Sequence, residues 1–240
     1  MVDVPVENHL WLLERFLEAL WAQEPKRVLD VGCGAGRLLR AAATRQVAAT
    51  GLDQEGPQLA ALRADGFAVQ DGSAERLPFQ DDAFDWVTMR HVPHHLANPA
   101  RGLAEALRVA RTGVLVAEPW FDPALPCQAA ALEYDRFEKR QHRRVGRVHG
   151  ESLVLAELIA LIPEGARGAI EVEARQWLRL RPREEGEALD AARALVADLP
   201  AEDPEHAALE QLATRIAADG LSWNGSVACL LRWRAPGAGA

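Results

Sequence analysis

The sequence predicts an α/β fold whose doubly wound, mostly parallel sheet has seven strands and carries helical insertions. Two patterns support this prediction. Short apolar runs alternate with helical patterns along residues 26–119, as expected for a parallel sheet with crossover helices. The runs are apolar at almost every position, which is typical of strands that are buried on both faces.

The elements follow in order along the chain. Residues 9–22 repeat apolar side chains at helical spacing and predict an amphipathic first helix. Strands are then expected at 27–32, 47–53, 67–71, 84–90 and 113–119, with helices at 36–44, 57–66 and 100–111. After Pro119 the alternation stops, and the pattern predicts helices at 126–140 and 151–163, strands at 169–180 and 226–235, and two helical stretches within 183–219.

Length and composition are those of a globular protein with a sizeable core. The chain has 240 residues, of which 49% are hydrophobic and 26% charged. With 35 acidic and 27 basic side chains the net charge is −8, which does not favour nucleic acid as a partner. Three scattered cysteines without a CxxC pair predict neither a disulfide framework nor a zinc site. No signal-peptide or membrane-span pattern occurs, so we expect a soluble cytoplasmic protein.

Charge is unevenly distributed in the second half of the chain. Residues 183–219 hold ten acids against three arginines, and residues 136–147 hold six cations against one acid. The acidic stretch is most simply a solvated helical pair. The basic run has three interpretations: a solvated helix face paired with acids, a site for an anionic group of a small ligand, or a docking surface for RNA.

The strongest local pattern is a glycine loop that directly follows the first strand. Gly32, Gly34 and Gly36 have the spacing G-x-G-x-G, and Arg37 stands where a dinucleotide fold requires its last glycine. Asp30 precedes the loop, and an anion there suits a cationic ligand group better than a diphosphate. No lysine follows the glycines, which excludes a P-loop.

Two further acids end the next two strands. Asp53 lies about 20 residues after the loop, where doubly wound folds hold ribose hydroxyls. Asp71, followed by Gly72, Ser73 and Ala74, can receive an exocyclic amine and leaves room for a flat ring. The three acids should converge at the carboxyl edge of the sheet. The implied ligand has an amine, a ribose and an adenine-like ring but no phosphates, and S-adenosylmethionine fits this description.

On these residues the chain resembles the class I S-adenosylmethionine-dependent methyltransferases, in particular the branch that acts on quinone precursors, sterols and natural products. The matching segments are VLDVGCGAGRLL, GLDQ, QDGSAERLPFQDDAFDWV, HVPHHLANP and LVAEP. The resemblance implies a seven-stranded sheet whose last strand is inserted antiparallel. Strands 169–180 and 226–234 are then the sixth and seventh, and residues 183–219 are an acidic helical insertion.

The resemblance also implies roles for individual residues. Asp30 and the three glycines would surround the methionine part, Asp53 would hold the ribose, and Gln54 would flank the adenine. Asp71 and the Gly72–Ala74 backbone would bind the adenine edge. The backbone at Arg90–His91 would accept from the methionine ammonium, and His95 matches a histidine that the family often has at the start of the following helix.

Methyl transfer is an in-line displacement at a sulfonium carbon, so a general base is needed only when the acceptor must lose a proton. The candidates for such a base are His91, His95 and Glu118, with His94 beside them. The alternative to a catalytic role is a structural one, in which His94 and His95 cap and pack the following helix. No metal site is expected, because no further ligand lies near this H-x-x-H-H pattern.

We expect one domain made of a lid helix at 1–22, a cofactor-binding core at 26–119, a substrate-side cap at 119–150 and the insertion at 183–219. Acceptor contacts are expected from Trp120, Tyr134, Arg143 and Arg144. The favoured activity is methyl transfer to a small molecule. The alternatives are a tRNA methyltransferase and a non-catalytic protein that binds S-adenosylmethionine, and a homodimer is left open.

Overall fold

The chain forms two compact units. The computed structural model describes residues 4–234. One part, which we call the sheet unit, contains Arg15–Glu118, Ser152–Arg175 and the chain from Val227 onward. The other, the cap unit, contains the chain up to Glu14, Pro119–Glu151 and Gln176–Ser226. The expected single domain and its subdivision stay a prediction, and residues 1–3 of the expected lid helix lie outside the described part.

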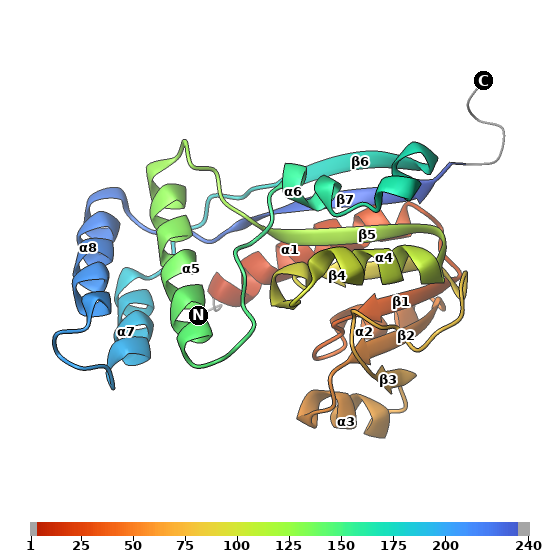
Figure 1. Ribbon diagram of the computed structural model, residues 1–240, viewed down its shortest axis with the longest axis horizontal. Helices are drawn as coiled ribbons and strands as arrows, with labels where there is room; N and C mark the ends of the chain where they lie inside the picture. The colour runs from red at the N-terminus through yellow and green to blue at the C-terminus, as the bar shows by residue number, and fades with distance from the viewer. Residues whose placement is uncertain (1–3, 235–240) are drawn as a thin grey trace. The chain divides into compact units, whose positions relative to one another are not determined.

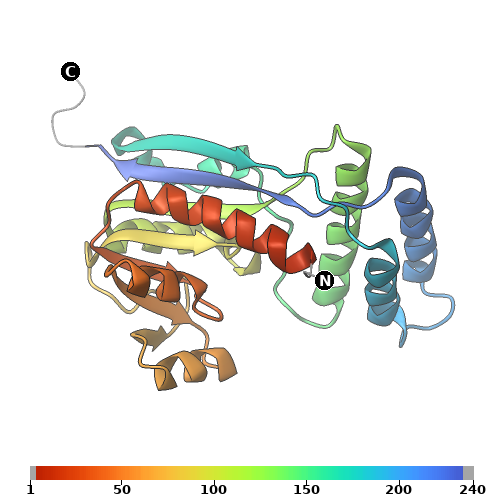
Figure 2. The same ribbon diagram turned by 180° about the vertical axis from the view of Figure 1, so that it is seen from behind.

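Seven strands form one sheet, in the order β3-β2-β1-β4-β5-β7-β6. Their bounds are Arg27–Val31 (β1), Ala48–Asp53 (β2), Val69–Asp71 (β3), Phe84–Arg90 (β4), Ala110–Trp120 (β5), Ile170–Trp177 (β6) and Gly225–Trp233 (β7). The strands from β3 to β5 pair in parallel. β7 lies between β5 and β6 and points in the opposite direction to β4 (Figure 2). The predicted mostly parallel sheet is confirmed.

Helices cover both faces of this sheet. They are α1 (Val4–Trp21), α2 (Arg37–Thr44), α3 (Pro57–Ala64), α4 (Pro99–Val109) and α6 (Leu155–Ala160), with short 3-10 turns η1 (Pro93–His95) and η2 (Glu164–Ala169). α4 lies in front of the sheet in Figure 1, and α1 lies on the opposite face in Figure 2. Phe16, Ala19 and Leu20 of α1 are buried, which explains its apolar stripe. Among residues 4–234, no helix combines the length and apolar character needed to cross a membrane.

Several predicted boundaries were wrong by a few residues. The helix expected at 100–111 ends at Val109, because β5 begins at Ala110 and continues to Trp120. The helix expected at 151–163 is only Leu155–Ala160, and Pro163 precedes η2. The helix expected at 126–140 extends as α5 (Pro126–Arg144), with three basic side chains in its last turn. Cations there interact favourably with the helix dipole, which supports the extra turn.

The cap unit has its own apolar core, formed by three helices. They are α5, α7 (Glu185–Val196) and α8 (Pro204–Asp219). Their inner faces bury Tyr134 and Phe137 of α5 among small and branched side chains of α7 and α8. The two helical stretches predicted within the acidic segment are therefore present, and each contributes one apolar face to this core.

Candidate functional site

The carboxyl ends of neighbouring strands bring the predicted acids into one row. Asp53 and Asp71 are register partners at the ends of β2 and β3, and Asp30 pairs with Gly51 one strand further on. In an open α/β sheet, the crevice outside these strand ends is the usual ligand site. The sheet unit thus places the three acids where the sequence predicts them.

The glycine loop folds tightly over the end of β1. Gly32, Gly34 and Gly36 all have positive φ angles, of 69°, 50° and 71°. A Cβ atom built on Gly32 would lie 2.5 Å from Cγ2 of Val92, so the loop packs directly against the segment after β4. The Gly34 N–H donates to Oδ2 of Asp53 at 2.8 Å, and this bond holds the Asp53 carboxylate beside the loop.

Asp30 is a buried acid whose surroundings disfavour the charged form of its carboxyl group. Its side chain is 6% exposed, and burial raises its pKa to about 7. The Thr88 hydroxyl donates to Oδ1 of Asp30 at 2.8 Å. Arg90 lies two residues beyond Thr88 on β4, on the same side of the strand. Burial lowers the Arg90 pKa to about 10, and its buried Nη2 has no hydrogen-bond partner among the described residues.

The segment after β3 forms a compact turn next to Asp53. The Gly72 N–H donates to the Asp53 carbonyl at 3.0 Å, and Ser73 forms an isolated bridge with Arg76. The Asp71 side chain is exposed, while Ala74 is 8% exposed. The Gln54 N–H donates to Oδ1 of Asp53 at 2.8 Å. Polar and small groups therefore stand side by side along this edge, as the resemblance implies.

A histidine–carboxylate pair lies beyond the ends of β4 and β5. Nδ1 of His94 lies 2.7 Å from Oε2 of Glu118, a fully buried carboxylate. The Leu153 N–H also donates to this oxygen, at 3.3 Å. A carboxylate oxygen accepts hydrogen bonds, so an N–H at Nδ1 of His94 suits this contact. His91, the first residue after β4, has a φ of 58°, a strained value that concentrates at functional sites.

The proposed capping role of His94 and His95 was wrong. Asn98 is the N-cap of α4, and its side chain accepts a hydrogen bond from the Arg101 N–H at 3.0 Å. His95 belongs to the preceding 3-10 turn rather than to the start of α4, and its ring centre lies 4.2 Å from that of His94. Asn98, and neither histidine, is therefore the N-cap of α4.

The four predicted acceptor residues belong to the cap unit. Trp120 is the last residue of β5, and Tyr134 is buried in α5. Arg143 donates to the His149 carbonyl at 2.7 Å and pairs with Glu151 at 3.3 Å. Arg144 pairs with Asp203 at 2.6 Å. The basic run therefore makes ion pairs with acids from its own segment and from the acidic one.

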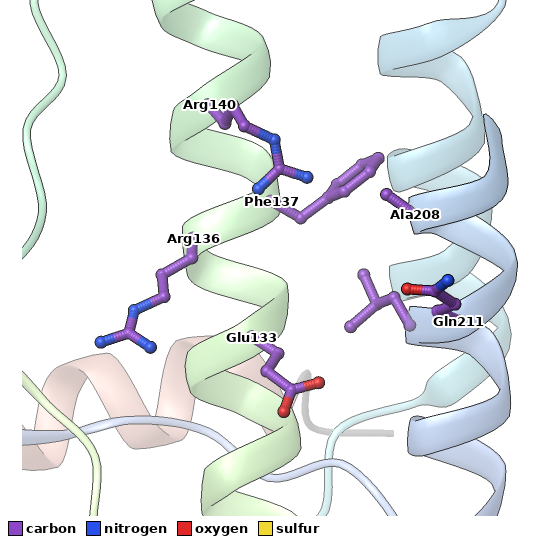
Figure 3. A pocket seen from close by; sticks show the side chains of 7 residues that line it. Glu133, Arg136, Phe137, Arg140, Ala208 and Gln211 are labelled. Atoms are coloured by element: carbon purple, nitrogen blue, oxygen red, sulfur yellow. The ribbon is translucent and has the colours of Figure 1, made fainter. Parts of the chain in front are cut away.

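The cap unit also has a hollow between α5 and α8. Figure 3 shows Phe137 pointing from α5 toward α8, with Glu133, Arg136 and Arg140 along one side. Its volume is about 210 Å³, below the ~300 Å³ at which pockets for drug-sized ligands begin. Arg140 is already bonded to Glu205 at 2.7 Å. This hollow is therefore too small and too well neutralised to be the main ligand site.

Two contributors to the site were not identified from the sequence. Thr88 lies within a buried strand, and its pairing with Asp30 follows only from the strand register. The contact between His94 and Glu118 joins residues 24 positions apart. The sequence indicates that His94 and Glu118 lie close to strand ends, but no spacing in the sequence indicates that the two side chains are in contact.

Comparisons with known proteins agree with this geometry. A family described as "Methyltransferase domain" matches residues 29–117. A demethylmenaquinone methyltransferase from Mycobacterium sp. (strain JLS) is 30% identical over 178 residues, which cover 69% of this chain and 77% of that protein. A ubiquinone biosynthesis O-methyltransferase from Hahella chejuensis is 32% identical over 107 residues, which cover 41% of this chain and 44% of that protein.

Solved structures show the same fold. The YcgJ protein from Bacillus subtilis superimposes with a TM-score of 0.57 at 20% identity, covering 88% of this chain and 92% of that one. The matched segments span between about a third and a half of the first curated relatives. The mycobacterial relative, in contrast, is matched over more than two thirds of its length. The chain therefore belongs to the class I S-adenosylmethionine-dependent methyltransferases, the family that uses S-adenosylmethionine as methyl donor.

Proposed function

We propose that this protein transfers a methyl group from S-adenosylmethionine to a small-molecule acceptor. The observation that carries the proposal is the row formed by Asp30, the glycine loop and Asp53 at the carboxyl edge of the sheet. The names of the relatives indicate the acceptor class, because two of them act in quinone biosynthesis. We infer an acceptor of that kind, an aromatic ring that carries a hydroxyl group.

The residues present fit the cofactor part by part. Both Asp53 oxygens accept one backbone N–H each, which leaves lone pairs for two ribose hydroxyls. The buried Asp30 carboxylate suits the methionine ammonium, and the unpartnered Nη2 of Arg90 suits the methionine carboxylate. Asp71 and the turn from Gly72 to Ala74 would hold the adenine edge, with Gln54 beside it. The cofactor supplies an electrophilic methyl group on a sulfonium.

We propose that Nε2 of His94 is the general base that removes the proton of the acceptor hydroxyl. Glu118 is then a positioning residue, since its hydrogen bond to Nδ1 holds the ring and stabilises the imidazolium. Loss of that proton makes the aromatic oxygen, and the ring carbon conjugated with it, nucleophilic enough to accept a methyl cation. His91 and His95, the other histidines that the sequence offers as a base or as cofactor contacts, lie in the same segment after β4.

Ion pairing in the cap unit favours a small acceptor over RNA. Arg143 and Arg144 each bond to an acid, so the basic run offers less positive charge than its sequence suggests. RNA binding relies on phosphate contacts from uncommitted cations and weakens steeply with salt. The RNA alternative predicts salt-sensitive binding of total tRNA that is lost in Arg143→Ala/Arg144→Ala.

The test is a transfer assay with methyl-labelled S-adenosylmethionine and a panel of hydroxylated aromatic compounds. We expect a labelled aromatic product, and His94→Asn should lower kcat by roughly 10²–10⁴-fold while leaving the affinity for S-adenosylhomocysteine unchanged. Glu118→Gln should shift the pH profile of kcat. Label that enters only tRNA, or no label transfer to any compound in a cell extract, would contradict the proposal.

A further inference from the structure

The hydroxyl group of Thr88 lies within reach of two acceptors beside the first strand. Thr88 is a fully buried residue of β4, and the strand register pairs it with Asp30 of β1. Its Oγ1 lies 2.8 Å from Oδ1 of Asp30 and 3.3 Å from the carbonyl oxygen of Leu29. A hydroxyl group has one proton to donate and two lone pairs that accept. The Thr88 hydroxyl therefore donates fully to only one of these two oxygens at a time.

This geometry accommodates Asp30 in both of its protonation states. When Asp30 is ionised, the Thr88 hydroxyl donates to Oδ1, and the negative charge strengthens the bond. When Oδ1 is protonated, its O–H can donate to Oγ1 of Thr88, and the Thr88 hydroxyl can donate to the Leu29 carbonyl instead. In neither state does the buried Thr88 hydroxyl lose its acceptor, so a change of protonation leaves no costly unpaired donor there.

The charged groups that act on Asp30 come from the neighbouring strands and partly cancel. Burial is the largest influence and raises the Asp30 pKa, Arg90 on β4 lowers it, and Asp53 at the end of β2 raises it. Arg37 of α2 adds to the burial that lowers the pKa of Arg90. The Cys33 thiol in the glycine loop stays neutral, because burial raises its pKa to about 12. The ligand-free protein therefore holds both forms of Asp30 near neutral pH.

We propose that binding of the methionine ammonium releases one proton from Asp30, and that Thr88 is the positioning residue that stabilises the ionised form. A cation pairs with a carboxylate and not with the neutral acid, so binding selects the ionised state of Asp30. The Thr88 hydroxyl then donates to Oδ1, and the proton passes to the solvent. The contact between Asp30 and the ammonium rests on the proposed function, whereas the methyl acceptor has no part in this step.

The test counts the released protons by calorimetric titration with S-adenosylhomocysteine in two buffers of different ionisation enthalpy. Because the Asp30 pKa is about 7, the native protein should release close to one proton at about pH 6 and about half a proton at about pH 7. The affinity should fall by up to about tenfold for each pH unit below that value. Methylthioadenosine has the same nucleoside but no ammonium, so its binding should release no proton.

Thr88→Val keeps the shape of the side chain and removes the hydroxyl. Ionised Asp30 then loses a donor, so the pH of half-release should rise by about one unit. The affinity should fall about five- to tenfold between about pH 6 and 7 but less than about twofold at about pH 8. A merely structural defect would lower the affinity equally at every pH. Thr88→Ser keeps a hydroxyl and should restore the native pH dependence.

The matched control is Thr44→Val, which removes an exposed hydroxyl that donates to the Ala41 carbonyl at 2.8 Å. It should change neither the affinity nor the proton release, and melting curves confirm that each variant is folded. The proposal is overturned by a native protein that releases no proton at about pH 6, by release that persists in Asp30→Asn, or by an unchanged pH dependence in Thr88→Val. Proton release by a protein that methylates no acceptor would uphold this inference and count against the proposed function alone.

Discussion

The two units use their charged residues in opposite ways. In the sheet unit, the key charges stand at strand ends in positions that cost stability: Asp30 is buried with a raised pKa, and a buried nitrogen of Arg90 lacks a partner within residues 4–234. In the cap unit, charges hold helices together: Glu205 of α8 accepts from Arg140 and Gln141 of α5. Buried charges that lack full pairing are expected where a bound ligand compensates them. Paired charges between helices are expected where they support the fold.

The sheet unit depends on close packing, and its most sensitive position is Gly113 of β5. A Cβ atom there would collide with the carbonyl oxygen of Leu231 and lie 3.0 Å from the Trp86 ring. Because a backbone atom of β7 must move, Gly113→Ala should cost about 3 kcal/mol or more of unfolding free energy. Gly165→Ala, which meets nothing within 4 Å, is the control and should change stability little in denaturant titrations. Similar melting points for the two variants would contradict this packing.

The cap unit depends on Glu205, whose side chain joins two helices. Its bonds to Arg140 hold the pKa of Glu205 below its usual value. Glu205→Ala should cost about 2–3 kcal/mol, because partly buried donors lose their acceptor. Asp190→Ala removes an exposed pair and should cost under about 0.5 kcal/mol. The Glu205 contribution is present above the unfolded pKa and should disappear as pH falls through the folded pKa.

Asp30 should show the opposite pH dependence. Its folded pKa of about 7 exceeds the ordinary value of 3.8, so the folded state binds more protons between these two pH values. The contribution of Asp30 to the free energy of unfolding therefore falls as pH rises from about 4 to 7, and it stays low at higher pH. Asp30→Asn should stabilise the ligand-free protein by about 1–3 kcal/mol at pH 8 and weaken cofactor binding. A native-like pH slope in the variant would refute the assignment.

The smallest expected effect is a change in the rate of amide hydrogen exchange in the predicted lid, residues 1–22 and 119–150. A cofactor that exchanges at every turnover requires a covering segment that moves. Hydrogen exchange should slow in these segments when S-adenosylhomocysteine is added. Phe16, Ala19 and Leu20 are buried, so the slowing should be confined to residues before them in α1. Equal protection with and without the ligand would make both segments fixed walls.

The sheet unit was the more predictable part of the molecule, for a physical reason. Its site is built from local patterns, and a run such as Val28–Gly36 determines strand, loop and helix start within nine residues. Strand alternation then places Asp53 and Asp71 beside Asp30 without further information. Once the first strand is identified, parallel pairing of short apolar strands leaves few alternative positions for the strands that follow.

The cap unit and the contacts between distant residues could not be predicted in this way. Tyr134, Arg183 and Trp223 are separated by at least 40 positions, and nothing in their spacing indicates that the Arg183 guanidinium lies close to both rings. The pairing of basic and acidic segments follows from how α5 and α8 pack. The tight contact between His94 and Glu118 depends on the ends of β4 and β5, which pattern analysis places only to within a few residues.

Calorimetric titration with S-adenosylhomocysteine and with NAD measures whether the strand-end acids form a site for S-adenosylmethionine. We predict one S-adenosylhomocysteine per chain and no binding of NAD, because the loop has G-x-G-x-G spacing with Asp30 before it. Asp53→Ala should weaken binding by about 1–3 kcal/mol, since ribose hydroxyls lose their acceptor. Binding of NAD in place of S-adenosylhomocysteine, or equal affinity in Asp53→Ala, would contradict the account.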